Sequence, residues 1–429
     1  MNQVSAIFEG LLENSKVDNS VKIAARRDEI TKALNKYFRG KESPTDNRLM
    51  VGSYGRWTAI RGISDLDLLY ILPASLRDTF EKEGGPSRVL TQVREAIEAR
   101  YPSTPVKVDR LVVVVEFADF MFEVQPVFEN TDQSFSYPDT KTDSWKFTKP
   151  RAEIKAMAEL NTTTHGNLRQ LCRMTRSWKN KHGVPLGGLL IDTLVCNFLR
   201  THSEYNAASS ATYDLLVRDF FLYLSEEDDH EFYAAVGSGQ RVAVKKRFQS
   251  KAKKAYNLAL TAIAAEGQKN AYKKWRAVFG NSVPVVDAFT LSASARSFAD
   301  SEEFIEEKYS VDVRYSLTID CTVTQDGFRP HSLRELLRNK QWLHAKKKLA
   351  FSISETDVPA PYQVRWKVLN RGVEAERRDM IRGQIVDGNS RGDRHETTSF
   401  RGDHLVECYI IKNRVVVARD EIEVPITTE

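Results

Sequence analysis

The sequence predicts an α+β protein: a mixed sheet with helices against it, then a helical lobe, then a β-sandwich-like C-terminal domain. Apolar strand-like segments alternate with a helical segment before residue 150, whereas residues 151–280 have helical periodicity almost throughout. Beyond residue 304, short β-rich segments are divided by Gly, Asn and Asp turns. We therefore expect lobes at 1–150 and 151–290, a linker at 291–303 and a β-rich domain at 304–429.

The N-terminal lobe begins with two helices in the first 40 residues, where apolar side chains recur at helical intervals. A short helix follows Gly52, a strand runs from about Leu66 to Leu72, and apolar residues four apart predict a helix from Ser87 to Arg100. The segment "VKVDRLVVVVEFADFMFEVQPVF" then predicts two long strands that join at Ala118 and Asp119. Together these strands and helices give the mixed sheet.

Helical periodicity continues through the second lobe. A hydrophilic stretch from Ser292 to Glu307 then predicts the linker. Segments such as "YQVRWKVLN", "HLVECYIIK" and "RVVVARDEIEVPI" predict the strands of a sandwich. The helices expected in the second lobe are Asn167–Lys181, Leu189–Arg200, Ser210–Leu224, Gln240–Ala265 and Asn270–Phe279.

The composition is that of a soluble globular protein, with 41% apolar and 28% charged residues. The longest aliphatic run, Leu111 to Val115, is far shorter than the roughly 20 residues that cross a bilayer. The N-terminal segment has no secretory signal pattern. We expect a cytoplasmic protein with no membrane partner.

Cysteine and histidine positions support neither a disulfide framework nor a zinc site. The four cysteines lack the spacing of a redox motif or a metal knuckle, so we expect reduced core residues. His395, His404 and Cys408 are close in sequence but have no fourth ligand at a convincing spacing.

Positive charge is concentrated in two segments, Lys245–Tyr256 and Ala345–Ala350, of a chain whose net charge is +5. Each segment is either a solvated helix face or a surface for a polyanion such as nucleic acid. The sequence favours the solvated face, which makes nucleic acid a second-choice partner.

Two carboxylates stand one residue apart in "GSYGRWTAIRGISDLDLLYIL", at the start of an apolar strand. Side chains alternate along a strand, so Asp65 and Asp67 point to one face while Leu66 and Leu68 point to the other. Two like charges on a half-buried strand repel unless a cation lies between them, and Mg²⁺ or Mn²⁺ also binds triphosphate oxygens. A turn or a helix cap is the alternative explanation of the pair.

The preceding Gly-Ser turn favours the metal site over the cap. Gly52 lets the backbone approach a phosphate closely. Ser53 and the N-terminal amides of the following helix can donate to phosphate oxygens. A glycine-serine turn followed by Asp-x-Asp on a strand is a phosphoryl-transfer arrangement.

A second metal ion needs a third carboxylate from a neighbouring strand. Glu123 alternates with Phe122 and Val124 and shares a face with Gln125, so it is the preferred candidate. The competing acids are Asp109, Glu116 and Asp119.

These residues resemble a known superfamily. The segment that begins "GSYGRWTAIRGISDLDLLYIL", followed by "FEVQPVF", is similar to polymerase-β-type nucleotidyltransferases. It is more similar still to the bacterial relatives of cyclic GMP-AMP synthase and oligoadenylate synthase, called CD-NTases or SMODS nucleotidyltransferases. The resemblance implies a polymerase-β-like fold in which Gly52 and Ser53 contact the donor triphosphate. The implied ligands of two Mg²⁺ or Mn²⁺ ions are Asp65, Asp67 and Glu123.

The chain departs from the family pattern at two places. The family more often has aspartate where this chain has Glu123, which keeps the charge on a longer arm and changes the geometry and metal preference. Gly187 and Gly188 stand where relatives have a serine. We therefore expect a hydroxyl contact to the donor to be missing or replaced.

The helix that reads "NLRQLCRMTRSWKNKHG" carries a basic stripe of Arg169, Arg173 and Arg176 that we expect to face away from the core. Arg176 matches a family lysine for the donor phosphates, and Lys179 is the substitute if the register shifts. Arginine suits this role because its guanidinium donates two bonds at once. A plain surface stripe is the alternative.

The C-terminal segments "WKVLNRG", "RGQI", "HETTSFRGDHLVECY" and "ARD" resemble the adenylyl/guanylyl and SMODS C-terminal sensor domain, AGS-C. The resemblance implies a sensor of a nucleotide or a phage-derived cue that controls the catalytic lobes. Polar and aromatic groups here either bind a phosphate-rich ligand or form internal salt bridges. They are Trp366, Asn370, Arg371, Arg378, Arg382, His395, Glu396, Arg401, His404 and Glu407.

The resemblance implies an antiphage enzyme of the CBASS type. It would join nucleoside triphosphates, ATP first among them, into a cyclic oligonucleotide that acts on a separate effector, with release of pyrophosphate. One alternative is a linear RNA or deoxyadenosine-type DNA oligomer, including one primed on protein, or a nucleotide tail on tRNA; the basic segment Lys245–Lys254 supports it. A non-catalytic nucleotide sensor is the third reading, and the intact acidic residues argue against it.

Overall fold

The computed structural model describes residues 2–285, 302–324, 329–341, 343–344, 347–370, 373–378, 380 and 382–427. Most of the linker predicted at 291–303 lies outside these residues. The chain forms two compact units. The first comprises Met1–Ser177, Gly187–Gly267 and Lys274–Pro284, and the second comprises Trp178–Leu186, Gln268–Lys273 and Val285–Glu429.

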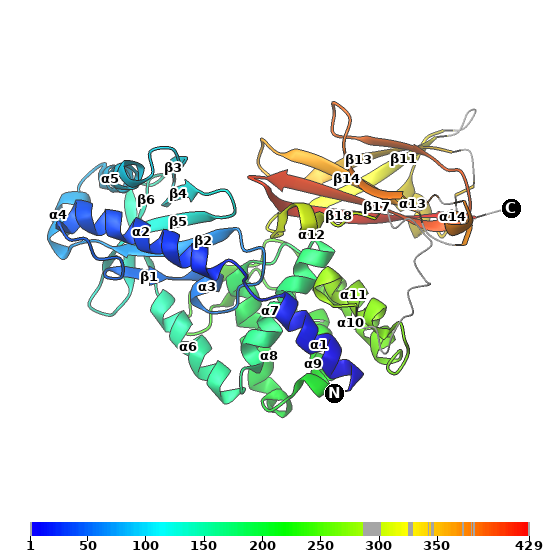
Figure 1. The fold of residues 1–429 in the computed structure, drawn as a ribbon, viewed down its shortest axis with the longest axis horizontal. Coiled ribbons are helices and arrows are strands. Elements are labelled where there is room, and N and C mark those ends of the chain that lie inside the picture. Colours follow the sequence, from blue (N-terminus) through cyan, green and yellow to red (C-terminus); the bar gives the residue numbers. More distant parts are fainter. Residues whose placement is uncertain are drawn as a thin grey trace. The chain divides into compact units, whose positions relative to one another are not determined.

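A seven-stranded mixed sheet lies in the first unit (Figure 1). Its path is β1-β2-β5-β4-β3, and β6 and β7 continue from β5 through antiparallel pairs. Strands β2 and β5 are parallel, whereas β1 with β2 and β4 with β5 are antiparallel. The strands are β1 Arg48–Met50, β2 Asp65–Ile71, β3 Val106–Asp109, β4 Val112–Glu116, β5 Met121–Glu129, β6 Phe135–Asp139 and β7 Ser144–Thr148.

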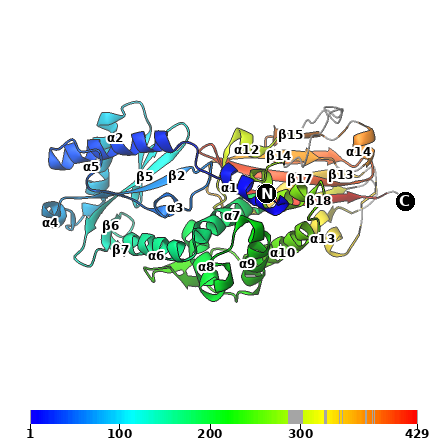
Figure 2. The same ribbon diagram turned by 60° about the horizontal axis from the view of Figure 1, so that its bottom comes forward.

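Helices α2 (Ser20–Arg39) and α5 (Gly85–Arg100) pack against one face of this sheet (Figures 1 and 2). Leu66 of β2 and Phe122 of β5 are fully buried in one apolar cluster with Val93 of α5. Burying an apolar side chain of this size stabilises the fold by roughly 1.5–3 kcal/mol. Because side chains alternate along a strand, this packing leaves the opposite face of β2 and β5 for polar residues.

A helical lobe forms the rest of the first unit (Figure 2). The ring centroid of Phe8 in the first helix lies 4.8 Å from that of Trp275, so the start of the chain packs into this lobe. Helix α7 continues into the second unit at Trp178. The helices are α1 Gln3–Asn14, α6 Pro150–Thr163, α7 Asn167–His182, α8 Gly188–Thr201, α9 Tyr213–Glu226, α10 Gln249–Ile263 and α11 Ala271–Phe279, with short helices α3 Gly52–Gly55 and α4 Arg77–Phe80 near the sheet strands in sequence.

The second unit contains a sandwich of two sheets, as the sequence predicts. One sheet has the order β10-β18-β17-β14-β15 and the other β12-β11-β13-β16. Phe351 of one sheet and Trp366 of the other are buried in the shared core, with ring centroids 6.3 Å apart. The elements are α12 Ile305–Lys308, β10 Ser310–Val311, β11 Leu317–Thr324, β12 His331–Ser332, α13 Leu333–Arg338, β13 Lys348–Thr356, β14 Gln363–Leu369, α14 Val373–Arg377, β15 Arg382–Asp387, β16 Arg394–Thr397, β17 Gly402–Lys412 and β18 Val415–Ile426.

Two predicted elements differ from the structure. The helix predicted from Gln240 begins only at Gln249, because a hairpin of β8 (Phe232–Ala234) and β9 (Arg241–Ala243) precedes it. The two long strands predicted between residues 106 and 128 are three, because the chain turns at Arg110, which has a φ of 21°, and β3 pairs with β4.

Within the described residues, no helix combines the length and the apolar character needed to span a membrane. The four cysteines are buried and form no disulfide, as the sequence predicts.

Candidate active site

Three predicted carboxylates come from neighbouring parallel strands. In the register of β2 and β5, Asp67 is directly opposite Glu123, and Asp65 is opposite Met121. All three carboxylate residues are half-buried, whereas Leu66 between the two aspartates is fully buried. The parallel pairing therefore brings Asp65, Asp67 and Glu123 to one face of the sheet, opposite the core.

The competing acids have other surroundings. Asp109 is exposed at the end of β3. Glu116 lies 2.9 Å from Lys107 Nζ, and Asp119 accepts a 2.6 Å hydrogen bond from Lys22. Glu123 is thus the acid that the sheet puts beside Asp67.

Gly52 lies against the carboxylate of Asp67. It begins α3 with a φ of +61°, and Val51 N donates to Asp67 O at 3.0 Å. A Cβ atom on Gly52 would lie 1.8 Å from Asp67 Oδ2, far inside van der Waals contact. Glycine is therefore required here both by the left-handed backbone and by the close approach to the carboxylate. Ser53 is half-buried in the same short helix, and its carbonyl accepts hydrogen bonds from the chain just beyond it.

A buried charge cluster ties the segment after this turn to helices α6 and α8. Arg56 Nε donates to Asp192 Oδ2 at 2.8 Å, and Arg176 Nη1 lies 2.7 Å from Asp192 Oδ1. Burial disfavours the ionised carboxylate, but the charges of Arg176 and Arg56 outweigh it and hold the pKa of Asp192 below its ordinary value. Arg56 also lies 3.5 Å from Glu153, and burial raises the pKa of that carboxyl group.

Arg176 and Lys179 do not lie on an exposed stripe, since the two residues are only 4% and 5% exposed. Arg176 Nη2 donates to Gly188 O at 3.0 Å, at the place where the family pattern has a serine. Within the second unit, Lys179 Nζ donates to Asp312 Oδ1 at 2.7 Å. The expected outward direction of the stripe is wrong for Arg176, because its partner Asp192 is internal. Lys179, which is not part of that stripe, is also internal and is paired with Asp312. Their contact with donor phosphates stays a prediction.

A metal site is not preformed among the described residues, where no three or more His, Cys, Asp or Glu side chains are grouped to hold an ion. The donor types on the face of β2 and β5 nevertheless suit Mg²⁺ or Mn²⁺, which prefer carboxylate oxygens. The chemistry of the donor set therefore fits these ions.

Comparison with known protein families shows which family has these residues in its catalytic domain. Residues 1–161 match the Second Messenger Oligonucleotide or Dinucleotide Synthetase (SMODS) domain, and residues 299–427 match the Adenylyl/Guanylyl and SMODS C-terminal sensor domain, AGS-C. The chain is a CD-NTase with a C-terminal AGS-C domain. The turn at Gly52 and all three carboxylates of this CD-NTase lie inside the SMODS match.

Relatives of this CD-NTase include the cyclic AMP-AMP-AMP synthase of Acinetobacter sp. (strain ATCC 27244 / 9458), which is 25% identical over 262 residues, or 54% of this chain and 71% of the relative. Among solved structures, the E. coli MS115-1 CdnC:HORMA-deltaN complex is 16% identical with a TM-score of 0.49, covering 64% of this chain and 96% of that chain. The Vibrio cholerae DncV apo form is 16% identical with a TM-score of 0.46, covering 66% and 86%.

Two of the polar residues predicted for ligand binding in the AGS-C domain are structural. Trp366 is fully buried, and its Nε1 donates to Gly392 O at 2.7 Å. Glu407 is 4% exposed and accepts a 2.6 Å hydrogen bond from Arg419. Such internal pairs are the alternative that the sequence left open.

The other predicted residues of this CD-NTase's AGS-C domain have mixed surroundings. Arg382 and Glu396 form a two-bond ion pair, with distances of 2.7 and 3.0 Å. Asn370 and His404 line the same pocket as this pair. His395, Arg378 and Arg401 are exposed, and Arg371 lies outside the described residues.

Sequence reasoning missed Arg56, Glu153 and Asp192. One signal was present: Asp192 is the only charge in the apolar run "GLLIDTLVCNFL". Aspartate is almost never fully buried unless it is paired, so its position inside a buried helix predicts a cationic partner. The identity of that partner depends on tertiary contacts.

Proposed function

We propose that this CD-NTase joins nucleoside triphosphates, ATP among them, into a cyclic oligonucleotide and releases pyrophosphate with each bond formed. The observation that carries this proposal is the register that sets Asp67 opposite Glu123, with Gly52 against the Asp67 carboxylate. The two family matches and the cyclic AMP-AMP-AMP synthase relative support the same reaction.

In each cycle, an acceptor hydroxyl attacks the α-phosphorus of a donor triphosphate. The new oxygen–phosphorus bond forms, the bond to pyrophosphate breaks, and the hydroxyl proton passes to solvent. We assign Asp65, Asp67 and Glu123 to holding two Mg²⁺ or Mn²⁺ ions. Such ions supply charge neutralisation and lower the pKa of the attacking hydroxyl. Gly52 and Ser53 contact the donor triphosphate in this scheme.

Arg176 is the proposed cation for the donor phosphates, and Lys179 is its substitute. Each already has an acidic partner, Asp192 for Arg176 and Asp312 for Lys179. A triphosphate would therefore have to replace or share these partners. Arg176 is the first choice because it also contacts the carbonyl of Gly188, at the position of the family serine.

We further propose a role in antiphage defence, in which the cyclic product acts on a separate effector and the AGS-C domain responds to a nucleotide or phage-derived cue. The family resemblance supports this role. Cells that carry the effector should resist phage with the wild-type enzyme and lose that resistance with Asp65→Ala plus Asp67→Ala. Equal resistance with both proteins would contradict the role.

A linear oligomer or a nucleotide tail on tRNA is the second candidate, and one observation favours it. Lys245, Lys253 and Lys254 are exposed at and before α10, whose alanine face is buried. An exposed basic surface can contact a primer or tRNA backbone, with binding that weakens steeply as salt rises.

Pyrophosphate release from mixed nucleoside triphosphates tests the catalytic assignment. Asp67→Asn and Glu123→Gln should each reduce the rate at least about a hundredfold, because both changes remove charge from the proposed ion-binding face. Asp109→Asn is the matched control, since Asp109 is an exposed acid of the same sheet, and its rate should stay within twofold of wild type. A wild-type rate in Asp67→Asn would overturn the assignment. So would a complete lack of pyrophosphate release, by the wild-type protein as well as the variants, with either Mg²⁺ or Mn²⁺.

A further inference from the structure

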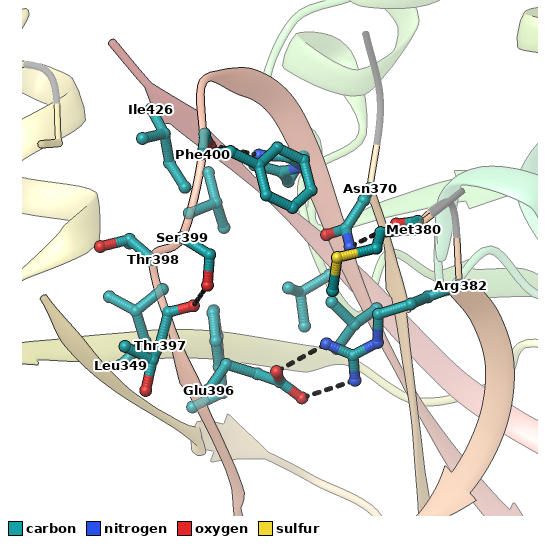
Figure 3. Close-up of a pocket in the computed structure, with 15 residues that line it drawn as sticks. Leu349, Asn370, Met380, Arg382, Glu396, Thr397, Thr398, Ser399, Phe400 and Ile426 are labelled. Carbon is teal, nitrogen blue, oxygen red and sulfur yellow. Dashed lines mark hydrogen bonds and ion pairs between the residues drawn. The ribbon is translucent and has the colours of Figure 1, made fainter. Parts of the chain in front are cut away.

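A pocket opens between the two sheets of the AGS-C sandwich (Figure 3). It encloses about 490 Å³ of empty space, including solvent at its mouth. Its floor is apolar and consists of core residues from both sheets, among them Phe351, Val368 and Val424. An apolar floor with a few polar groups on the wall is the composition typical of a small-molecule site.

The Arg382–Glu396 ion pair forms one wall of the pocket (Figure 3). Arg382 has a φ of +61°, and it lies beside the register shift in the pairing of β14 with β15. Such strain at a residue other than glycine, and such irregularities of strand pairing, concentrate at binding sites. The side chain of Arg382 crosses from β15 to Glu396 on β16, so the pair joins the two sheets at the pocket wall.

The polar wall of the pocket offers hydrogen-bond acceptors. Glu396 Oε1 accepts from both Arg382 and Arg394, whereas Oε2 accepts only from Arg382 among the described residues. Burial opposes ionisation, but Arg382 and Arg394 hold the pKa of Glu396 below its ordinary value, so the group is a carboxylate at neutral pH. Asn370 donates its amide to Met380 O at 2.7 Å, and its side-chain oxygen accepts nothing from the described chain.

These hydrogen-bond acceptors and their surroundings exclude two classes of ligand, phosphates and permanent cations. A phosphate would face the oxygens of Glu396 and Asn370 and an apolar floor, and the Arg382 guanidinium on this wall already donates two hydrogen bonds to Glu396, which disfavours a phosphate. A permanent cation would lie beside the Arg382 guanidinium. A neutral ligand with N–H donors meets neither obstacle, and the side chains of Phe400 and Met380 in the pocket lining favour a flat ring (Figure 3).

We propose that this pocket binds a neutral, flat, amino-substituted heteroaromatic group whose N–H bonds point to Glu396 and Asn370. The proposal differs from both alternatives that the sequence left open for these polar residues, a phosphate-rich ligand and internal salt bridges alone. It does not depend on the proposed transferase function, because every residue that carries it lies in the AGS-C domain.

Calorimetric titration of nucleosides without phosphate tests the proposal. The protein should carry Asp65→Ala plus Asp67→Ala, so that the transferase face contributes little to binding. Adenosine, guanosine and cytidine supply an amino group, and purine riboside, inosine and uridine are their counterparts without it. We expect at least one amino-bearing nucleoside to bind at least tenfold more tightly than its counterpart.

Variants at the mouth and the wall complete the test. Ser399→Trp blocks the mouth from an exposed position and should weaken that binding at least tenfold. Ser354→Trp, at an exposed position of β13 outside the pocket, is the matched control and should leave binding within twofold. Glu396→Gln should also weaken it at least tenfold, with an unchanged circular dichroism spectrum as the check on folding.

Three results would overturn the proposal. The first is no binding of any amino-bearing nucleoside. The second is binding that Ser399→Trp leaves unchanged. The third is tighter, salt-sensitive binding of nucleoside triphosphates that Ser399→Trp abolishes, which would indicate a phosphate site instead.

Discussion

Gly52 and Asp67 form the tightest contact of the candidate catalytic face, because a glycine backbone lies where any side chain would meet the Asp67 carboxylate. Gly40 has almost the same backbone conformation, with φ of +64° against +61°, but no atom lies within 4 Å of a Cβ placed there. Comparing alanine substitutions at the two glycines therefore separates the effect of backbone strain from the effect of collision with the Asp67 carboxylate.

Gly52→Ala should reduce pyrophosphate release at least about a hundredfold, because the new methyl group must displace the Asp67 carboxylate. Gly40→Ala should cost about 1 kcal/mol of unfolding free energy and leave the rate unchanged. Urea unfolding and the release assay measure both effects. A folded Gly52→Ala protein with the wild-type rate would show that the close contact has no catalytic role.

Asp192→Asn should lower the free energy of unfolding by about 3 kcal/mol or more, because Arg56 and Arg176 lose a buried counter-charge. The pKa of Asp192 is lowered on folding, so its stabilising effect is full above the ordinary value of 3.8 and disappears as the pH falls further. Urea unfolding at pH 7 and pH 3 checks this, with the exposed Asp18→Asn as control. An equal effect of Asp192→Asn at both pH values would contradict the lowered pKa.

At the scale of elements, the sequence was most informative where one face of a strand is buried. The alternation around Leu66 and Phe122 predicts β2, β5 and the shared face of their acids, because successive side chains of a strand point to opposite faces. The pattern was less informative before α10, where a hairpin interrupts a segment of helical composition. It also could not reveal that Arg176 is internal, because its partner Asp192 comes from another helix.

Arg176 and Lys179 of helix α7 have different acidic partners, which predicts different effects of their replacement. Lys179→Met should lower the free energy of unfolding of the second unit by about 1–3 kcal/mol, since Asp312 loses one of its two cations. It should change the KM for ATP less than twofold. Arg176→Lys should raise that KM at least fivefold, because lysine cannot donate two parallel bonds.

Urea unfolding and initial rates at varied ATP measure the two variants together. A larger rise of KM in Lys179→Met than in Arg176→Lys would contradict the preference for Arg176 over Lys179 as the cation that contacts the donor phosphates.

At the scale of the whole molecule, the two sequence matches correspond to two chemically different candidate sites. The face of β2 and β5 gathers the three carboxylates that we propose bind metal ions, whereas the AGS-C pocket combines an apolar floor with an internally balanced ion pair. Short motifs predicted the first site because the residues of Gly-Ser, and likewise those of Asp-x-Asp, lie close together in the sequence. The pocket joins Asn370, Arg382 and Glu396 from separate strands, so the sequence named these residues without showing how they meet.

The nature of the product is the most direct test of the central proposal. Purified protein and its Asp65→Ala plus Asp67→Ala variant would be incubated with labelled ATP, GTP, CTP and UTP and with Mg²⁺ or Mn²⁺, and the products resolved after phosphatase treatment. We predict a small phosphatase-resistant product that is absent from the variant. A phosphatase-sensitive ladder, label attached to protein, or the same product from the variant would contradict cyclic oligonucleotide synthesis at this face.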